Sequence, residues 1–69
     1  MENKRVIFDA YFDKLDDQQT IKPLTGLFQK WGNMLVNRDE KYYNVTYGII
    51  LGEDNVVYCV PPNHIKVIN

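Results

Sequence analysis

The fold is decided by one stretch of sequence, NVTYGIIL-GEDN-VVYCV, which comprises Asn44–Leu51, Gly52–Asn55 and Val56–Val60. Both flanking segments are rich in β-branched and aromatic residues, which favour strands. The four residues between them tolerate left-handed backbone, as a tight hairpin turn requires. The stretch therefore predicts a β-hairpin in which Leu51 pairs with Val56 around a loop of two or four residues.

Side chains alternate between the two faces of a strand, so this register predicts one buried and one outer face. The buried face consists of Val45, Tyr47, Ile49, Leu51, Val56, Tyr58 and Val60. The outer face consists of Thr46, Gly48, Ile50, Val57 and Cys59. Ile50, Val57 and Cys59 then form an exposed apolar stripe, which is typical of a surface covered by a partner or by a second copy.

Upstream, the segment Arg5–Phe12 alternates with the period of a strand. Its core-facing residues are Val6, Phe8, Ala10 and Phe12. The segment Asp13–Lys22 has no hydrophobic period, so we expect a long exposed loop that ends at Pro23. The acids in and beside it indicate a solvated surface and not a metal site, because their spacing is not that of a calcium loop.

Residues 24–36 fit two patterns. Their large apolar residues follow a helical stripe: Leu27, Phe28, Trp31, Met34 and Leu35. Gly26 and Gly32 oppose a helix, since each costs about 1 kcal/mol in a helix interior. We favour a strand bent by a bulge near Trp31–Gly32, with the glycine supplying a positive φ, and we keep the helix as the alternative.

The remaining segments complete a small all-β domain. The charged segment Asn37–Lys41 predicts a loop, and Pro61-Pro62 predicts a turn before a last short strand at Ile65–Ile68. Five short strands, a long first loop and no long helix favour a small five-stranded closed barrel that spans residues 1–69 as a single domain.

The composition of the chain excludes several kinds of site and partner. The 69 residues include one Cys and one His, and eight Lys/Arg against nine Asp/Glu give a net charge of −1. One Cys cannot form an internal disulfide, and two ligands cannot hold a structural zinc ion. The sequence shows no secretory or membrane-spanning segment, so we expect a cytoplasmic protein. Near-neutral charge argues against a strong polyelectrolyte partner.

The end of the chain, Val60–Ile68 (VPPNHIKVI), resembles the close of Src homology 3 domains, where a Pro-x-Asn-Tyr-Val turn leads into a last short strand. The segment Val6–Asp9 likewise resembles the Ala-Leu-Tyr-Asp opening of those domains. The resemblance implies a Src homology 3-like barrel across most of the chain.

The peptide-binding residues of that family are only partly present. Phe8 matches the first tyrosine of the opening motif, Ala10 replaces the second, and His64 replaces the tyrosine of the final turn. Tyr42 and Tyr43 stand where the family has its tryptophan. The departures argue against polyproline binding in that groove, although aromatic residues still line the region.

A second resemblance covers about residues 24–68. The motif Gly26–Gly32 (GLFQKWG), followed by a charged insert and an alternating hairpin, is similar to small uncharacterised bacteriophage and prophage proteins with a Gly-x-Phe-x-x-Trp-Gly motif. Proteins of this class often bind and redirect a host protein, including host defence enzymes. The resemblance thus implies a phage accessory protein in the bacterial cytoplasm.

Together these observations predict a protein-binding module with no cofactor. Phe28 is expected in the core, and Trp31 becomes the anchor of an interface if it is exposed beside Tyr42 or Tyr43. The candidate partner-binding residues are Trp31, Tyr42, Tyr43, Tyr11, His64, Ile50 and Val57. A homodimer through the outer hairpin face is a further expectation.

Two other classes of function compete with protein binding. A single-stranded nucleic-acid module is the alternative, and it requires convergence of Lys22, Lys30, Arg38 and Lys41 on one face. An enzyme is not expected, because Cys59 and His64 are separated by Pro61-Pro62 and no third orienting group accompanies them.

Overall fold

The computed structural model describes residues 3–13 and 17–68. Its elements are β1 (Arg5–Phe12), β2 (Gln18–Arg38), β3 (Lys41–Gly52), β4 (Val57–Val60), the short 3₁₀ turn η1 (Pro62–His64) and β5 (Ile65–Val67). The strands form one antiparallel sheet in the order β4-β3-β2-β1-β5. The predicted all-β fold with five strands and a short turn before the last strand is confirmed.

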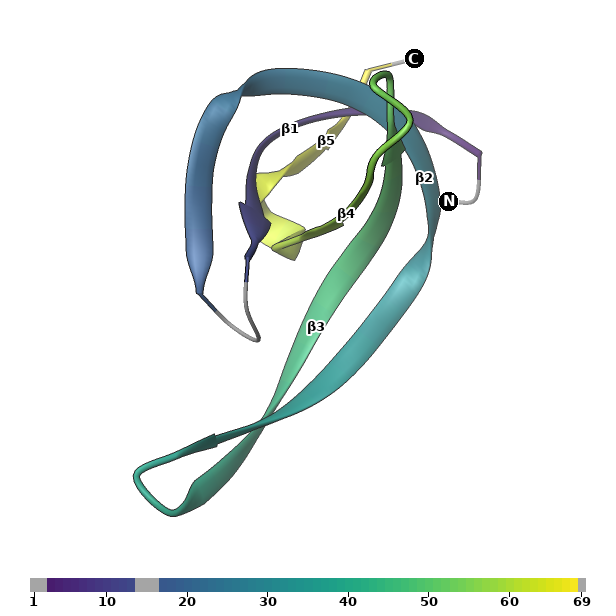
Figure 1. The fold of residues 1–69 in the computed structure, drawn as a ribbon. Coiled ribbons are helices and arrows are strands. Elements are labelled where there is room, and N and C mark those ends of the chain that lie inside the picture. Colours follow the sequence, from purple (N-terminus) through teal and green to yellow (C-terminus); the bar gives the residue numbers. More distant parts are fainter. Residues whose placement is uncertain (1–2, 14–16, 69) are drawn as a thin grey trace.

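The sheet curls on itself, as Figure 1 shows, and its inner side chains form a small core. The fully covered side chains of this core are Val6, Phe8, Phe28, Ile50 and Val60. The curl brings β4 across from β1, where the ring of Tyr58 lies 5.1 Å from that of Phe8 and 5.4 Å from that of Tyr11. The two edge strands, β4 and β5, are joined through the turn at η1.

The predicted loop from Asp13 to Lys22 is shorter than expected. Strand β2 already begins at Gln18, which pairs with Phe12, and it runs through Pro23. A proline lacks the N–H that a ladder requires. The ladder accommodates it where residues 21–23 of β2 oppose the single residue Asp9 of β1. Asp16 of the acidic segment lies outside the described residues.

Residues 24–36 all belong to β2, so the helical alternative is wrong. The predicted bulge exists but lies earlier than expected, because the register shifts between Phe28 and Lys30. None of the glycines adopts a positive φ, so the expected role of Gly32 is also wrong. The strand bends at Gln29, the residue left without a β3 partner.

Strands β2 and β3 continue beyond the curled sheet as a two-stranded ribbon, which we call the arm (residues 30–47). Figure 1 shows it projecting from the curled sheet. With the arm included, the principal extents of the molecule are 41 × 23 × 19 Å. Its turn is only Asp39–Glu40, with φ of 51° and 65°, so the predicted loop Asn37–Lys41 is shorter and its flanking residues are paired.

The hairpin between β3 and β4 has a different register from the predicted one. Leu51 pairs with Val57 instead of Val56. The Gly52 N–H donates to the Val56 carbonyl at 2.9 Å, which leaves a three-residue loop whose last member, Asn55, has a φ of 64°.

Because this loop has an odd number of residues, the register differs from the predicted one by one residue, and the two faces of β3 are exchanged. Ile50, predicted on the outer face, therefore points into the core and is fully buried. Ile49 and Leu51 occupy the outer face in its place, opposite Cys59 and Val57. After the turn, Val60 is buried and Val57 is 62% exposed, as predicted, but Val56, which was predicted on the buried face, is 47% exposed.

Candidate functional site

One face of the arm carries three large apolar side chains that remain exposed. Trp31, Leu35 and Tyr42 are 47%, 62% and 67% exposed, respectively. Trp31 lies opposite Gly48 and Leu35 opposite Asn44, so with Tyr42 they follow the even-numbered positions of β3. Directly opposite residues of an antiparallel pair share a face, so the three side chains lie on one surface, which we call the Trp31 face.

One pair of polar side chains between these apolar groups is hydrogen-bonded within the arm. The Thr46 hydroxyl donates to Asn33 Oδ1 at 2.9 Å, between Trp31 and Leu35. This bond links β2 to β3 on the Trp31 face itself. The exposed apolar side chains therefore sit on a cross-linked ribbon and not on a loose loop.

Trp31 is held at the base of the arm by the core. Its ring meets that of Phe28 edge-on, with centroids 4.8 Å apart, and Phe28 is 1% exposed. A Cβ on Gly48 would lie 2.9 Å from the Phe28 ring, so the glycine leaves the space that this ring occupies. One side of the indole is thus fixed while the other faces solvent, as a preorganised interface anchor requires.

The opposite face of the arm is better covered. Val36 is only 3% exposed and lies opposite Tyr43, which is 50% exposed. The Tyr47 ring covers Gly32, because a Cβ there would lie 2.8 Å from the ring. Tyr43 therefore does not share a surface with Trp31.

Tyr42 does share the Trp31 face but does not lie beside the indole. Six positions of the β3 ladder separate it from Gly48, the residue opposite Trp31, or about 20 Å. Leu35 fills part of this gap as the diagonal neighbour of Tyr42. Leu35 was not among the predicted binding residues. Its spacing of four from Trp31 would have placed it on the same face had residues 24–36 been assigned firmly to a strand.

The cations named for nucleic-acid binding are spread over the molecule. Lys30, Arg38 and Lys41 share the face of Tyr43, on the far side of the ribbon from Trp31. Lys30 and Lys41 stand at opposite ends of that face, eight ladder positions apart, or about 27 Å. Lys22 belongs to the part of β2 that runs beside β1. The four cations do not converge.

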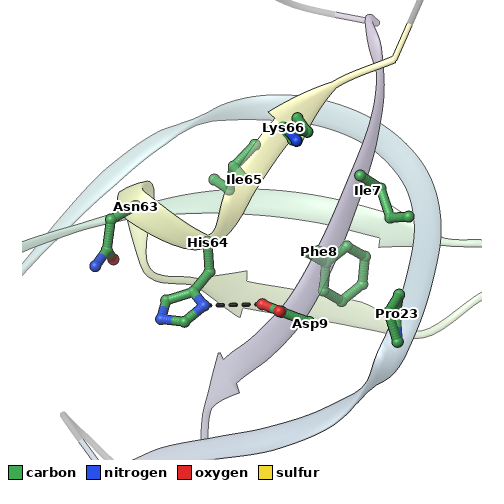
Figure 2. Close-up of a pocket in the computed structure, with 8 residues that line it drawn as sticks. All are labelled: Ile7, Phe8, Asp9, Pro23, Asn63, His64, Ile65 and Lys66. Atoms are coloured by element: carbon green, nitrogen blue, oxygen red, sulfur yellow. Dashed lines mark hydrogen bonds and ion pairs between the residues drawn. The ribbon is translucent and has the colours of Figure 1, made fainter.

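A pocket of about 340 Å³ lies beside the turn at η1 (Figure 2). Its lining residues are Ile7, Phe8, Asp9, Pro23, Asn63, His64, Ile65 and Lys66. Figure 2 shows the His64 ring and the Asp9 carboxylate pointing toward each other. His64 Nδ1 lies 2.8 Å from Asp9 Oδ1, and His64 Nε2 lies 3.1 Å from the Gln18 amide nitrogen.

The hydrogen bonds of His64 define its role. An amide nitrogen can only donate, so His64 Nε2 accepts from Gln18, and the ring proton on Nδ1 is donated to Asp9. This chain of bonds ties η1 to both β1 and the start of β2. The predicted binding residue His64 therefore holds the turn in place. Tyr11, also predicted, is partly covered and packs on Tyr58.

Cys59 lies on the outer face of β4, opposite Ile49. Burial raises the pKa of its thiol, which reduces the reactive thiolate at neutral pH. In the described residues no group of three or more His, Cys, Asp or Glu side chains is placed to hold a metal ion.

Comparison of the chain with protein-family models, with curated proteins and with solved structures gives no match. No helix in residues 3–13 and 17–68 is long and apolar enough to cross a membrane.

Proposed function

We propose that this chain is a non-enzymatic protein-binding module that docks on its partner through the Trp31 face. The observation that carries the proposal is the exposure of Trp31, Leu35 and Tyr42 together on one side of a projecting arm. A chain of 69 residues needs most of its large apolar side chains for its core. Three that remain outside on one face therefore indicate a surface that a partner covers.

The chemistry of the face fits protein recognition. Tryptophan and tyrosine dominate the binding energy of protein interfaces, where a rigid aromatic group fills a pocket of the partner. The indole of Trp31 is already fixed against Phe28, so little conformational freedom is lost on binding. With a net charge of −1 the chain has no strong field to steer a partner, so shape and apolar contact supply the recognition.

The resemblances noted in the sequence give this module a context. The ending VPPNHIKVI supports a Src homology 3-like barrel, and the motif GLFQKWG supports a phage or prophage accessory protein. In that context the partner is a host or defence protein in the bacterial cytoplasm, whose activity the module modulates or inhibits.

Paired variants test the proposal. Leu35→Ala and Tyr42→Ala remove exposed side chains of the Trp31 face, and Val57→Ala removes an equally exposed side chain from β4. We expect the unmodified chain and Val57→Ala to capture the same protein at fixed stoichiometry from a host lysate, and the two arm variants to lose it. Far-UV circular dichroism confirms that all variants fold. Retention by both arm variants would contradict the proposed surface.

Single-stranded nucleic acid remains the rival ligand, and the scattered cations do not favour it. A titration with single-stranded DNA and RNA at low ionic strength should show no binding. Affinity that falls steeply as salt is added would replace the protein-binding proposal with this one.

A further inference from the structure

The arm leaves one edge of β3 open. In the described part of the chain β4 pairs with β3 only between Gly48 and Leu51, and no strand pairs with the same edge at Lys41–Tyr47. The residues from Tyr42 to Leu51 carry no charge and are rich in β-branched and aromatic types. Natural proteins interrupt such exposed edges with charges, prolines or bulges unless the edge is paired.

The open edge presents unpaired backbone groups in a regular series. The Gly52 N–H donates to Val56, so the backbone groups of Gly52 point toward the β4 side. Strand β3 has no bulge of its own, and backbone groups alternate between the two sides of a strand. The N–H and C=O groups of Tyr42, Asn44 and Thr46 therefore point outward along the open edge.

We propose that this edge of β3 pairs antiparallel with the same edge of a second copy of the chain, giving a two-fold dimer. The two arms then form a four-stranded sheet in the order β2-β3-β3-β2. Interfaces of two-fold dimers bring the same surface of each subunit together, so the segment has to be self-complementary.

Length and register meet this requirement. The open segment has seven residues with Asn44 at its centre. A two-fold axis at Asn44 pairs Tyr42 with Thr46 of the second copy, and Tyr43 with Val45 of the second copy. These are aromatic and β-branched combinations that stabilise adjacent strands. The ladder has about six backbone hydrogen bonds and stops where β4 begins.

Charge selects this edge over that of β2. On the other side of the arm the edge of β2 begins at Lys30, and antiparallel self-pairing centred on Met34 would place Lys30 opposite Arg38 of the second copy. Like charges in directly opposite positions destabilise a pair of strands. In the β3 dimer Lys41 lies opposite Tyr47 instead, and no charged pair faces across the ladder.

The shape of the chain also fits a second copy. The arm projects from the curled sheet (Figure 1). Antiparallel pairing of two arms therefore places the curled sheets of the two subunits at opposite ends of the four-stranded sheet. The contact lies along the edge and not on a face. Each subunit therefore keeps its Trp31 face open, and this dimer surface differs from the outer β3–β4 face of Val57 and Cys59. Dimerisation along this edge is independent of partner binding by the Trp31 face.

Sedimentation velocity over a wide concentration range tests the dimer. We expect the unmodified chain to shift from monomer to dimer as its concentration rises. Asn44→Lys and Asn44→Asp each bring two like charges together at the two-fold axis. Each should raise the dissociation constant of the dimer about fivefold or more at low salt. In an equal mixture of the two variants, the dissociation constant of the dimer should return to within about twofold of the value for the unmodified chain.

Two further variants complete the test. Asn37→Lys adds the same charge to β2, one strand away from the axis, and should leave dimerisation unchanged. Asn44→Pro removes an outward-pointing N–H without removing a bond to β2, and should abolish the dimer while the circular dichroism spectrum is kept. A monomer at all concentrations, equal weakening by Asn37→Lys, or no recovery in the mixture would overturn the proposal. None of these outcomes affects capture of a different protein by the Trp31 face.

Discussion

Replacing Trp31 by alanine should lower the free energy of unfolding by more than the surface position of Trp31 suggests. Trp31 is 47% exposed, so about half of its side chain is covered. For an aromatic side chain of 150–250 Å² this corresponds to about 2–3 kcal/mol at 25 cal/mol per Å². The edge-on contact with Phe28 adds about 0.5–1.5 kcal/mol. The core of a domain this small contributes only about 3–5 kcal/mol of net stability, so Trp31→Ala should leave a chain close to unfolding.

Urea denaturation followed by far-UV circular dichroism measures this loss, because Trp31 is the only tryptophan and its fluorescence disappears in the variant. Trp31→Phe keeps a ring against Phe28 and should recover most of the stability. Leu35→Ala, at a position 62% exposed, should lose only about 0.5–1 kcal/mol. The reasoning is refuted if Trp31→Ala loses less than Leu35→Ala, or if Trp31→Phe is no better than Trp31→Ala.

Other predictions concern the hairpin between β3 and β4 and its neighbours. Gly26→Ala should lower the free energy of unfolding by about 1–3 kcal/mol, because the new Cβ would lie 2.5 Å from the backbone oxygen of Leu51. The urea midpoint should fall accordingly, and an unchanged midpoint would contradict this contact. The hydrogen bond from the Tyr58 hydroxyl, at 2.5 Å, and then that from the Val56 N–H lower the pKa of Asp54, so this stabilisation is present above the ordinary carboxyl pKa and is lost as pH falls through the folded value. Tyr58→Phe should therefore flatten the acid side of a plot of stability against pH, and an identical profile would rule the bond out as its cause. Burial raises the pKa of the Cys59 thiol, so iodoacetamide should modify the folded chain more slowly at neutral pH than the urea-unfolded chain; equal rates would show that the thiol is not shielded.

The strands could be predicted where a pattern of period two met a clear turn. The N-terminal strand was predicted with its bounds, and Val6, Phe8 and Ala10 are buried as expected. The start of β2 could not be predicted, because Gln18 and its neighbours are polar and pair with β1 through the backbone. Polar side chains give no periodic signal when neither of their faces is buried.

The register of the β3–β4 hairpin is harder to predict from the sequence than the strands themselves. The turn Gly52–Asn55 is visible in the sequence, but its composition does not state whether the loop has an even or an odd number of residues. The three-residue loop exchanged the faces of β3, so Ile50 was assigned to the surface although it is fully buried. On the arm, Trp31 and Tyr42 were identified by residue type alone. That Tyr42 shares the face of Trp31 and Leu35, while Tyr43 lies on the other face, follows only from the β2–β3 register.

The central claim is that the Trp31 face contacts a protein partner. Site-specific photocrosslinking tests it most directly: a benzoylphenylalanine is placed at Leu35, and in a control chain at Val57, both 62% exposed. After irradiation in cells that naturally contain the chain, position 35 should give one discrete adduct with a different protein, and position 57 should give none. An adduct from position 57 alone, or no adduct with another protein from position 35, would contradict the claim.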